Sequence, residues 1–181
     1  EALKAGISTN PVLQAFIHTV KEYKIDYHYI DAFLRSMEMD LTNSYYEPQQ
    51  YNEYIYGSAE VVGLMCLQVF TGNDKILFNE LIEPARSLGS AFQKVNFLRD
   101  IKSDMEERER IYLPGVNHAI KIDDENKRNL EKEIEIEFQK ALIGIKKLPV
   151  GVKLGVYSAY LYYKGLFKKI KRLKIKELMN E

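Results

Sequence analysis

The stretch NFLRDIKSDMEERERIYLP, residues 96–114, determines how the rest of the sequence is interpreted. It places Asp100 and Asp104 four residues apart, so that on a helix the two carboxylates lie one turn apart on the same face. Like charges at this spacing destabilise an isolated helix by roughly 0.2–0.5 kcal/mol. The pair therefore predicts a compensating cation close to this face.

The two aspartates belong to a longer polar stripe. At about 100° per residue, Gln93 and Asn96 fall on the same side of the helix as the aspartates, and Gly89 lies beside them and offers room. The apolar side chains between these positions point elsewhere. A stripe of amides and carboxylates is not typical of a helix face that packs in a core. We therefore interpret it as a candidate binding site.

The oxygen atoms on this stripe suit a hard divalent cation. Mg²⁺ is usually held by one or two carboxylates together with waters and substrate phosphates. The cation would also remove the repulsion between Asp100 and Asp104. Arg99, Arg108 and Arg110 stand nearby in the sequence and could bind the remaining phosphate charge through forked hydrogen bonds. The alternative is an exposed charged helix, because a DxxxD spacing alone is common.

The composition indicates one globular domain and excludes several classes of protein. The 181 residues can bury a core, and a hydrophobic content of 46% argues against disorder. The 26 basic and 26 acidic residues cancel, so we expect no nucleic-acid partner. The single cysteine, Cys66, excludes an internal disulfide and a cysteine-rich zinc site. It fits a reducing compartment, so we expect a cytoplasmic protein.

The spacing of apolar residues is helical along most of the chain, and no alternating strand pattern persists. We expect a bend or interruption at Pro84 and a loop from Pro114 to Asp124. No apolar run is long enough to cross a membrane. The sequence thus predicts a single all-α domain over residues 1–181, with helices at 11–22, 27–40, 48–70, 75–107, 125–147 and 150–173.

The stripe is part of a longer motif. The string Gln93-x-x-Asn96-x-x-Arg99-Asp100-x-x-x-Asp104, followed by RIYLP at 110–114, resembles the second aspartate-rich motif of the squalene/phytoene synthase family. The match is specific because further motifs follow the family's order from about residue 10 to about 173.

The further motifs lie on both sides of the stripe. Residues 37–41, MEMDL, resemble the family's GMxxDL helix end, with Ser36 where glycine is usual. Residues 54–63, YIYGSAEVVG, resemble its YxYxVAGxVG helix, with Glu60 in place of the second glycine. Leu148-Pro149 and the later pair Tyr163-Lys164 resemble its LP…YR C-terminal helices.

The resemblance implies an isoprenoid synthase fold, a helical bundle around a deep cavity, and the head-to-head joining of two allylic prenyl diphosphates through a cyclopropyl intermediate. It implies that Asp100, Asp104 and Asn96 hold Mg²⁺, or Mn²⁺ in its place, against a diphosphate. Gln93 and Arg99 would position the metals and phosphates. The remaining residues implied are Tyr54 and Tyr163, which would line the cavity near the reacting carbons, Arg110 and Tyr112, which would help to close the site, and Asp40, a helix-end or network residue.

This chemistry is consistent with the residues present. Ionisation of an allylic diphosphate requires neutralisation of the leaving group, which Mg²⁺ and arginine can supply. A carbocation requires dry, polarisable walls. The 13 tyrosines and 8 phenylalanines could supply aromatic ones.

One feature of the family is missing. Its first aspartate-rich motif, which faces the second across the cavity, is not found, because Asp26 and Asp31 have the wrong spacing. The chain also begins at Glu1 without a methionine. We therefore expect an N-terminally incomplete fold, roughly the last two-thirds of a family member. With one aspartate pair, this chain should bind Mg²⁺–diphosphate poorly and should not turn over.

The resemblance leaves the substrate open between geranylgeranyl and farnesyl diphosphate. We favour phytoene over a squalene-type product, because no C-terminal membrane anchor follows and nothing indicates a nicotinamide cofactor. The alternative is a catalytically inactive homologue that serves as a binding or assembly module. A third interpretation, a plain helical interaction protein, would leave the ordered series of motifs unexplained.

Some residues have a structural as well as a functional interpretation. Among the tyrosines at 46, 51, 54 and 56, we expect core positions except for Tyr54. Cys66 is expected in the core, and His18, His28 and His118 at packing or surface positions. The run Lys164–Lys176 holds seven basic residues among apolar ones and predicts either contact with an anionic membrane or a solvated face on a core helix.

Overall fold

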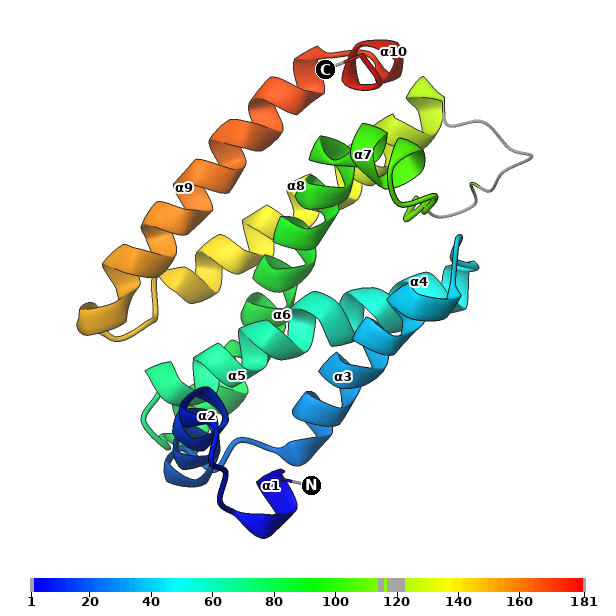
Figure 1. The fold of residues 1–181 in the computed structure, drawn as a ribbon. Helices are drawn as coiled ribbons and strands as arrows, with labels where there is room; N and C mark the ends of the chain where they lie inside the picture. Colours follow the sequence, from blue (N-terminus) through cyan, green and yellow to red (C-terminus); the bar gives the residue numbers. More distant parts are fainter. Residues whose placement is uncertain (1, 114–115, 117–122, 181) are drawn as a thin grey trace.

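The computed structural model describes residues 2–113, 116 and 123–180. In these ranges the chain is helical, with one isolated β-bridge between Tyr45 and Ile111 and no strand (Figure 1). The elements are α1 (Ala2–Ala5), α2 (Pro11–Glu22), α3 (Tyr27–Thr42), α4 (Pro48–Ile55), the π-helix η1 (Tyr56–Glu60), α5 (Val61–Phe70), α6 (Lys75–Arg99), α7 (Ile101–Glu106), α8 (Asp124–Ile145), α9 (Val150–Arg172) and α10 (Ile175–Leu178).

Local capping explains why most predicted helix starts are confirmed. The side chain of Asn10 accepts hydrogen bonds from the backbone N–H groups of the first turn of α2, which begins with a proline. Asp26, Asp74 and Asp123 cap α3, α6 and α8 in the same way. These caps are encoded within a few residues, so the sequence alone reveals them. The short helices α1 and α10 were not predicted.

The predicted helix over residues 75–107 is interrupted in the structure, but not at Pro84. Helix α6 runs through Pro84 and ends at Arg99, and α7 begins after Asp100. The hydroxyl of Ser103 donates a 3.1 Å hydrogen bond to the carbonyl oxygen of Asp100, and such back-bonding bends helices. The ring of Pro84 packs closely against Gly144 of α8, which helps α6 to continue past the missing N–H.

The predicted helix over residues 48–70 contains one turn of π-helix, η1. A Cβ atom on Gly57 would lie 2.4 Å from the carbonyl oxygen of Ala32 and 2.7 Å from the Cβ atom of Ser36, so α3 approaches this turn very closely. Ser36, which stands where the family usually has glycine, is a small residue and is 1% exposed. The π turn depends on this contact between distant segments, which the local sequence does not reveal.

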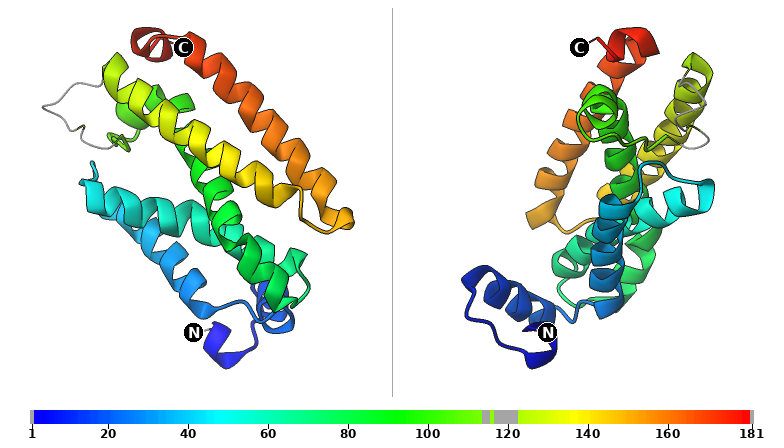
Figure 2. Two further views of the ribbon diagram at one scale, coloured as in Figure 1. Left: turned by 180° about the vertical axis from the view of Figure 1, so that it is seen from behind. Right: turned by 45° about the vertical axis from the view of Figure 1, so that its right-hand side comes forward.

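Helix α6 is central to the structure. It packs against α8 along one side and against η1, α5 and α9 on others. Figure 1 and Figure 2 show α8 and α9 on one side of the molecule and α3, α4 and α5 on the other, with α6 crossing between them. The polar stripe lies at the C-terminal end of this central helix.

The largest core cluster lies between α6, α8 and α9 and extends to α10. It includes Phe167 and Ile170 from the basic run Lys164–Lys176, and these side chains are 2% and 4% exposed. The apolar side of that run is therefore core, as the solvated-face interpretation predicted. In the part of the chain that the structure describes, no helix has the length and apolar character needed to cross a bilayer.

Candidate active site

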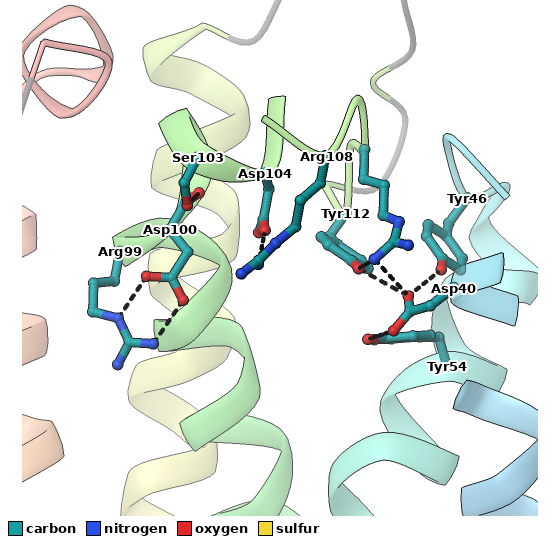
Figure 3. A network of polar contacts seen from close by, with 10 residues as sticks. Asp40, Tyr46, Tyr54, Arg99, Asp100, Ser103, Asp104, Arg108 and Tyr112 are labelled. Atoms are coloured by element: carbon teal, nitrogen blue, oxygen red, sulfur yellow. Dashed lines mark hydrogen bonds and ion pairs between the residues drawn. The ribbon is translucent and has the colours of Figure 1, made fainter. Parts of the chain in front are cut away.

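The aspartate stripe keeps its helical spacing across the break between α6 and α7 (Figure 3). The backbone N–H of Asp100 donates to the carbonyl oxygen of Asn96, and that of Asp104 donates to the carbonyl oxygen of Asp100, both at 2.8 Å. The two carboxylates therefore remain one turn apart. The spacing argument made from the sequence is correct even though the single helix it assumed is not.

Each carboxylate of the pair is bound by an arginine. Arg99 donates from Nε and Nη2 to the two carboxylate oxygens of Asp100, at 2.7 and 2.6 Å. Arg108 donates from Nη1 to Oδ1 of Asp104 at 2.6 Å. These charge-assisted bonds supply the compensating positive charge that the pair requires. Two arginines, a residue type suited to binding phosphate, are thus held beside the carboxylates.

The two carboxylates differ in burial. The side chain of Asp104 is 8% exposed, whereas that of Asp100 is 33% exposed. Burial raises the pKa of Asp104, and the negative charge of Asp100 adds to this effect, while the hydrogen bond and charge of Arg108 oppose it. The hydrogen bonds from Arg99 to Asp100 raise the pKa of Arg99. Burial therefore disfavours the charged form of Asp104, whereas the positive charge of Arg108 favours it.

The donor set fits a hard divalent cation. Asp100, Asp104 and Asn96 offer carboxylate and amide oxygens, the ligand type that Mg²⁺ prefers. Among the described residues, no group of three acidic, histidine or cysteine side chains that could hold a metal comes together. A cation here would therefore take further ligands from water or from substrate phosphates, as Mg²⁺ commonly does. The Asn96 amide oxygen accepts a 3.3 Å hydrogen bond from the Tyr163 hydroxyl.

A second polar cluster surrounds Asp40 near the end of α3. Its carboxylate accepts hydrogen bonds from the hydroxyls of Tyr46, Tyr54 and Tyr112 at 2.9, 3.1 and 2.8 Å (Figure 3). The Nη1 atom of Arg110 lies 4.0 Å from the same carboxylate. Asp40 is therefore the network residue that the sequence suggested, and it joins α3, α4 and the segment after α7.

The segment after α7 is fixed by backbone and ring contacts. The N–H of Ile111 donates to the carbonyl oxygen of Ser44 at 2.9 Å. The ring of Tyr112 stacks on Phe97 of α6 with centroids 4.6 Å apart. Arg110 is thereby held between the Asp40 cluster and Asp104, whose pKa it also lowers. Pro114, the last residue of the motif, and His118 lie outside the described residues.

A large apolar cavity begins at Gln93 and extends away from the aspartates. It has a volume of about 620 Å³, lies between η1, α5, α6, α8 and α9, and falls within the range typical of ligand sites. The aromatic walls expected from the composition are largely wrong, because Phe70 and Phe92 are the aromatic residues among the lining side chains. Small residues make up much of the wall, including Ala59, Gly155 and others.

The prediction that Tyr54 lines the cavity was wrong. Tyr54 is 4% exposed, and its hydroxyl is bound to Asp40 in the second cluster, away from the lining residues. Tyr163 also lies outside the lining, but its ring stacks on Phe92 with centroids 3.9 Å apart and thus supports the wall. Tyr46 and Tyr51 are buried, as predicted.

The prediction of a core position for Cys66 was also wrong. Cys66 is exposed and lines the cavity. Helix α5 is apolar on nearly all sides, so periodicity could not distinguish its core face from its cavity face. The surrounding apolar wall raises the pKa of the thiol by desolvation.

The glycines in the cavity wall serve two different structural purposes. A Cβ atom on Gly89 would lie 2.4 Å from the carbonyl oxygen of Ala59, so this glycine permits close helix packing rather than offering room as expected. Gly63 likewise meets the carbonyl oxygen of Ala85 at 2.8 Å. For Gly155 on α9 nothing lies within 4 Å, so its missing side chain leaves space in the cavity. A glycine within a helix was the available sequence signal for this wall.

Fold and site together define an all-α protein with a polar cluster of paired carboxylates and arginines at one end of an apolar cavity. The profile of the squalene/phytoene synthase family matches residues 2–123. The chain belongs to the squalene/phytoene synthase family.

Two curated relatives illustrate the similarity. The 15-cis-phytoene synthase of Synechocystis sp. is 31% identical, over 92% of this chain and 56% of the relative. The phytoene synthase of Arthrospira platensis is 27% identical, over 95% of this chain and 63% of the relative. The chain thus spans somewhat more than half the length of these relatives.

A solved structure shows the same fold. The squalene synthase HpnC from Alicyclobacillus acidocaldarius superposes with a TM-score of 0.79 at 18% sequence identity, over 94% of this chain and 69% of that one. This likeness confirms the all-α isoprenoid synthase fold predicted from the sequence.

Proposed function

We propose that this chain forms the diphosphate-binding and prenyl-binding part of a Mg²⁺-dependent prenyltransferase that condenses two allylic prenyl diphosphates head to head. Geranylgeranyl diphosphate, giving phytoene, is the favoured substrate, and farnesyl diphosphate, giving a squalene-type product, is the other. The names of the relatives support the reaction class. The activity is proposed for a protein that also supplies a second aspartate-rich segment, and the 181-residue chain alone is expected to be inactive.

The observation that carries the proposal is the continuity of the polar cluster with the apolar cavity. Gln93 lines the cavity, Asn96 follows on the same helix, and Asp100 caps its C-terminus within two turns of Gln93. An allylic prenyl diphosphate has the same division, with a charged head at one end of a long apolar chain. Its diphosphate would lie at the aspartates and its chain in the cavity.

The residues of the polar cluster would bind and orient the diphosphate. Arg99 and Arg108, now bound to the carboxylates, can transfer their forked donors to phosphate oxygens when a cation takes their place. Arg110 adds positive charge from the Asp40 side. The cation, Mg²⁺ or Mn²⁺, would be held by Asp100, Asp104 and Asn96 and would supply electrostatic stabilisation of the departing diphosphate. No nicotinamide cofactor is part of this proposal.

The cavity wall would exclude water from the reacting carbons. Aliphatic side chains and glycines line the cavity and would protect a carbocation from capture by water. Tyr163 would act from the second row of side chains, through Phe92 and Asn96. Tyr54 would act on the Asp40 cluster instead of on the reacting carbons.

Calorimetric titration of the chain with farnesyl and geranylgeranyl thiolodiphosphates, with and without Mg²⁺, tests the proposal. We expect weak binding that requires Mg²⁺. Asp100→Asn and Asp104→Asn should each weaken it about tenfold or more, equivalent to ~1.4 kcal/mol. Glu106→Gln is the matched control, because Glu106 is an exposed acid on the same helix α7. Binding that is equally strong without Mg²⁺, or that is unchanged by both aspartate substitutions, would contradict the proposal.

The second candidate is an inactive homologue that binds prenyl diphosphate or assembles with a partner. The arginine pairing of both carboxylates is compatible with it, since the structure is electrically balanced without a metal. Incubation of the full-length protein with either diphosphate and Mg²⁺ separates the two, because only an enzyme yields a condensed hydrocarbon. The retained carboxylate pair favours the enzyme.

A further inference from the structure

Three buried leucines line the end of the cavity that lies away from the aspartates. Leu67 of α5, Leu81 of α6 and Leu148 of the α8–α9 connection are 3%, 2% and 7% exposed and pack together as one core cluster. All three also line the cavity. Large side chains from three separate segments thus meet at this end of the cavity, and we refer to these three residues as the floor.

The depth of the floor follows from the register of α5 and α6. Gly89 lies against the carbonyl of Ala59, and Gly63 lies against the carbonyl of Ala85. Each step of four residues along one helix is therefore matched by four along the other, in antiparallel sense. Continuing this register places Leu67 level with Leu81. At ~1.5 Å per residue, the floor lies roughly 18 Å along α6 from the level of Gln93.

We propose that the floor sets the longest prenyl chain that the cavity accepts, and that Leu148 is its specificity-determining residue. The inference rests on the proposed function, because it assumes that the cavity holds a prenyl chain. Among the three leucines, Leu148 lies between helices rather than within one. Truncation of its side chain therefore opens the floor without removing a contact inside the α5–α6 hairpin.

The floor can discriminate between prenyl chains of different length because the free-energy contribution of each added methylene changes from favourable to unfavourable there. Up to the floor, each added methylene leaves water for an apolar wall and favours binding. Beyond it, a further isoprene unit must force apart a packed cluster or remain in water. One methylene too many or too few in an apolar pocket changes selectivity by about 10- to 200-fold.

Cys66 provides a reporter inside the cavity. It is the only cysteine in the sequence, it lines the cavity, and it directly precedes Leu67 in α5. A chain that reaches the floor must pass it and should shield the thiol from alkylation by N-ethylmaleimide. The protection of Cys66 and the calorimetric affinity are therefore measured together for geranyl, farnesyl, geranylgeranyl and geranylfarnesyl thiolodiphosphates in Mg²⁺.

The decisive comparison uses Leu148→Ala and Leu178→Ala. Leu178 is the matched control, since it is 6% exposed, packs in the largest core cluster and does not line the cavity. In wild type, affinity should rise with chain length to a limit and then fall about tenfold or more for the next homologue. Leu148→Ala should move this limit to the next longer homologue, whereas Leu178→Ala should leave it unchanged.

A second variant gives the opposite change and guards against misfolding of the first. Val152 lines the cavity and packs against the floor, so Val152→Phe should shorten the limit by one isoprene unit. If the ligands protect Cys66 but the length limit is the same in wild type and in both cavity variants, the assignment of the floor is overturned. The proposed function would remain intact. Failure of every ligand to bind and protect Cys66 in wild type would overturn both.

Discussion

Replacement of Lys94 by methionine tests the ionic contact that joins α6 to α8. The Nζ atom of Lys94 donates to Glu137 at 2.6 Å and to Glu133 at 3.0 Å, and Ser90 donates to the same oxygen of Glu137 at 2.8 Å. The side chains of Lys94 and Glu137 are 9% and 18% exposed. Removing one partner of a buried ion pair costs about 3–5 kcal/mol. Because Glu133 is half exposed, we expect a loss of about 3 kcal/mol, near the lower end of that range.

The loss should depend on pH in a defined direction. Burial raises the pKa of Glu137 above its ordinary 4.5, and Lys94 opposes the rise. Without Lys94 the pKa of Glu137 should rise further. A raised carboxyl pKa in the folded state makes the protein more stable below the unfolded pKa and less stable as the pH rises through the folded one. The deficit of the variant should therefore be largest near pH ~7 and shrink as the pH falls toward about 4.5.

Urea unfolding followed by circular dichroism at both pH values measures this deficit. Lys132→Met is the matched control, because Lys132 is an exposed lysine on α8 and its loss should change stability by less than about 0.5 kcal/mol. The double replacement Lys94→Met with Glu137→Leu should recover most of the loss, since no uncompensated buried charge remains. A deficit in Lys94→Met that is below about 0.5 kcal/mol, or independent of pH, would refute the reasoning.

Three further predictions concern other parts of the molecule. Asp40→Asn should lower the free energy of unfolding by about 2 kcal/mol, because three buried tyrosine hydroxyls lose a charged acceptor. Gly144→Ala should destabilise the protein by about 1–3 kcal/mol, since the new Cβ atom would lie 2.2 Å from Pro84. Gly165→Ala on α9 should stabilise the protein by about 0.5–1 kcal/mol, because nothing lies within 4 Å of its new Cβ atom. Calorimetric melting measures both effects. We propose that any membrane contact of the basic run Lys164–Lys176 is electrostatic, so that cosedimentation with anionic vesicles should disappear at about 1 M salt, and persistent binding would contradict this.

The sequence revealed the features that are encoded locally. Helix starts were predictable because Asn10, Asp74 and Asp123 bind backbone N–H groups two or three residues away. The aspartate stripe was predictable for the same reason, since its spacing depends on the helical repeat alone. Arg99 and Arg108, which the sequence suggested as phosphate ligands, lie within four residues of the carboxylates and pair with them in the structure.

The sequence could not reveal features that depend on contacts between distant segments. Gly89 and Gly155 are both glycines within helices, yet one meets a backbone carbonyl and the other faces open space. Cys66 and Leu67 are adjacent apolar residues of α5, yet one is exposed in the cavity and the other is 3% exposed. Tyr54 was assigned to the cavity through motif resemblance, but the position of Asp40 on α3 draws its hydroxyl elsewhere. In each case the neighbour that decides the outcome lies on another helix or on another face of the same one.

The electrostatics of α6 indicate why diphosphate binding at this site should require a cation. The C-terminus of a helix carries a partial charge of roughly −0.5, and here it meets the carboxylates of Asp100 and Asp104. Anion sites are more often built at helix N-termini, where the dipole attracts the ligand. At this end, the C-terminus of α6 and the two carboxylates would repel a diphosphate, and two of the nearby arginines are already engaged by those carboxylates. A divalent cation bound to the carboxylates would make the site positively charged and release Arg99 and Arg108 for the phosphates. Head-group affinity should therefore follow Mg²⁺ occupancy closely, whereas the contribution of the apolar chain should not.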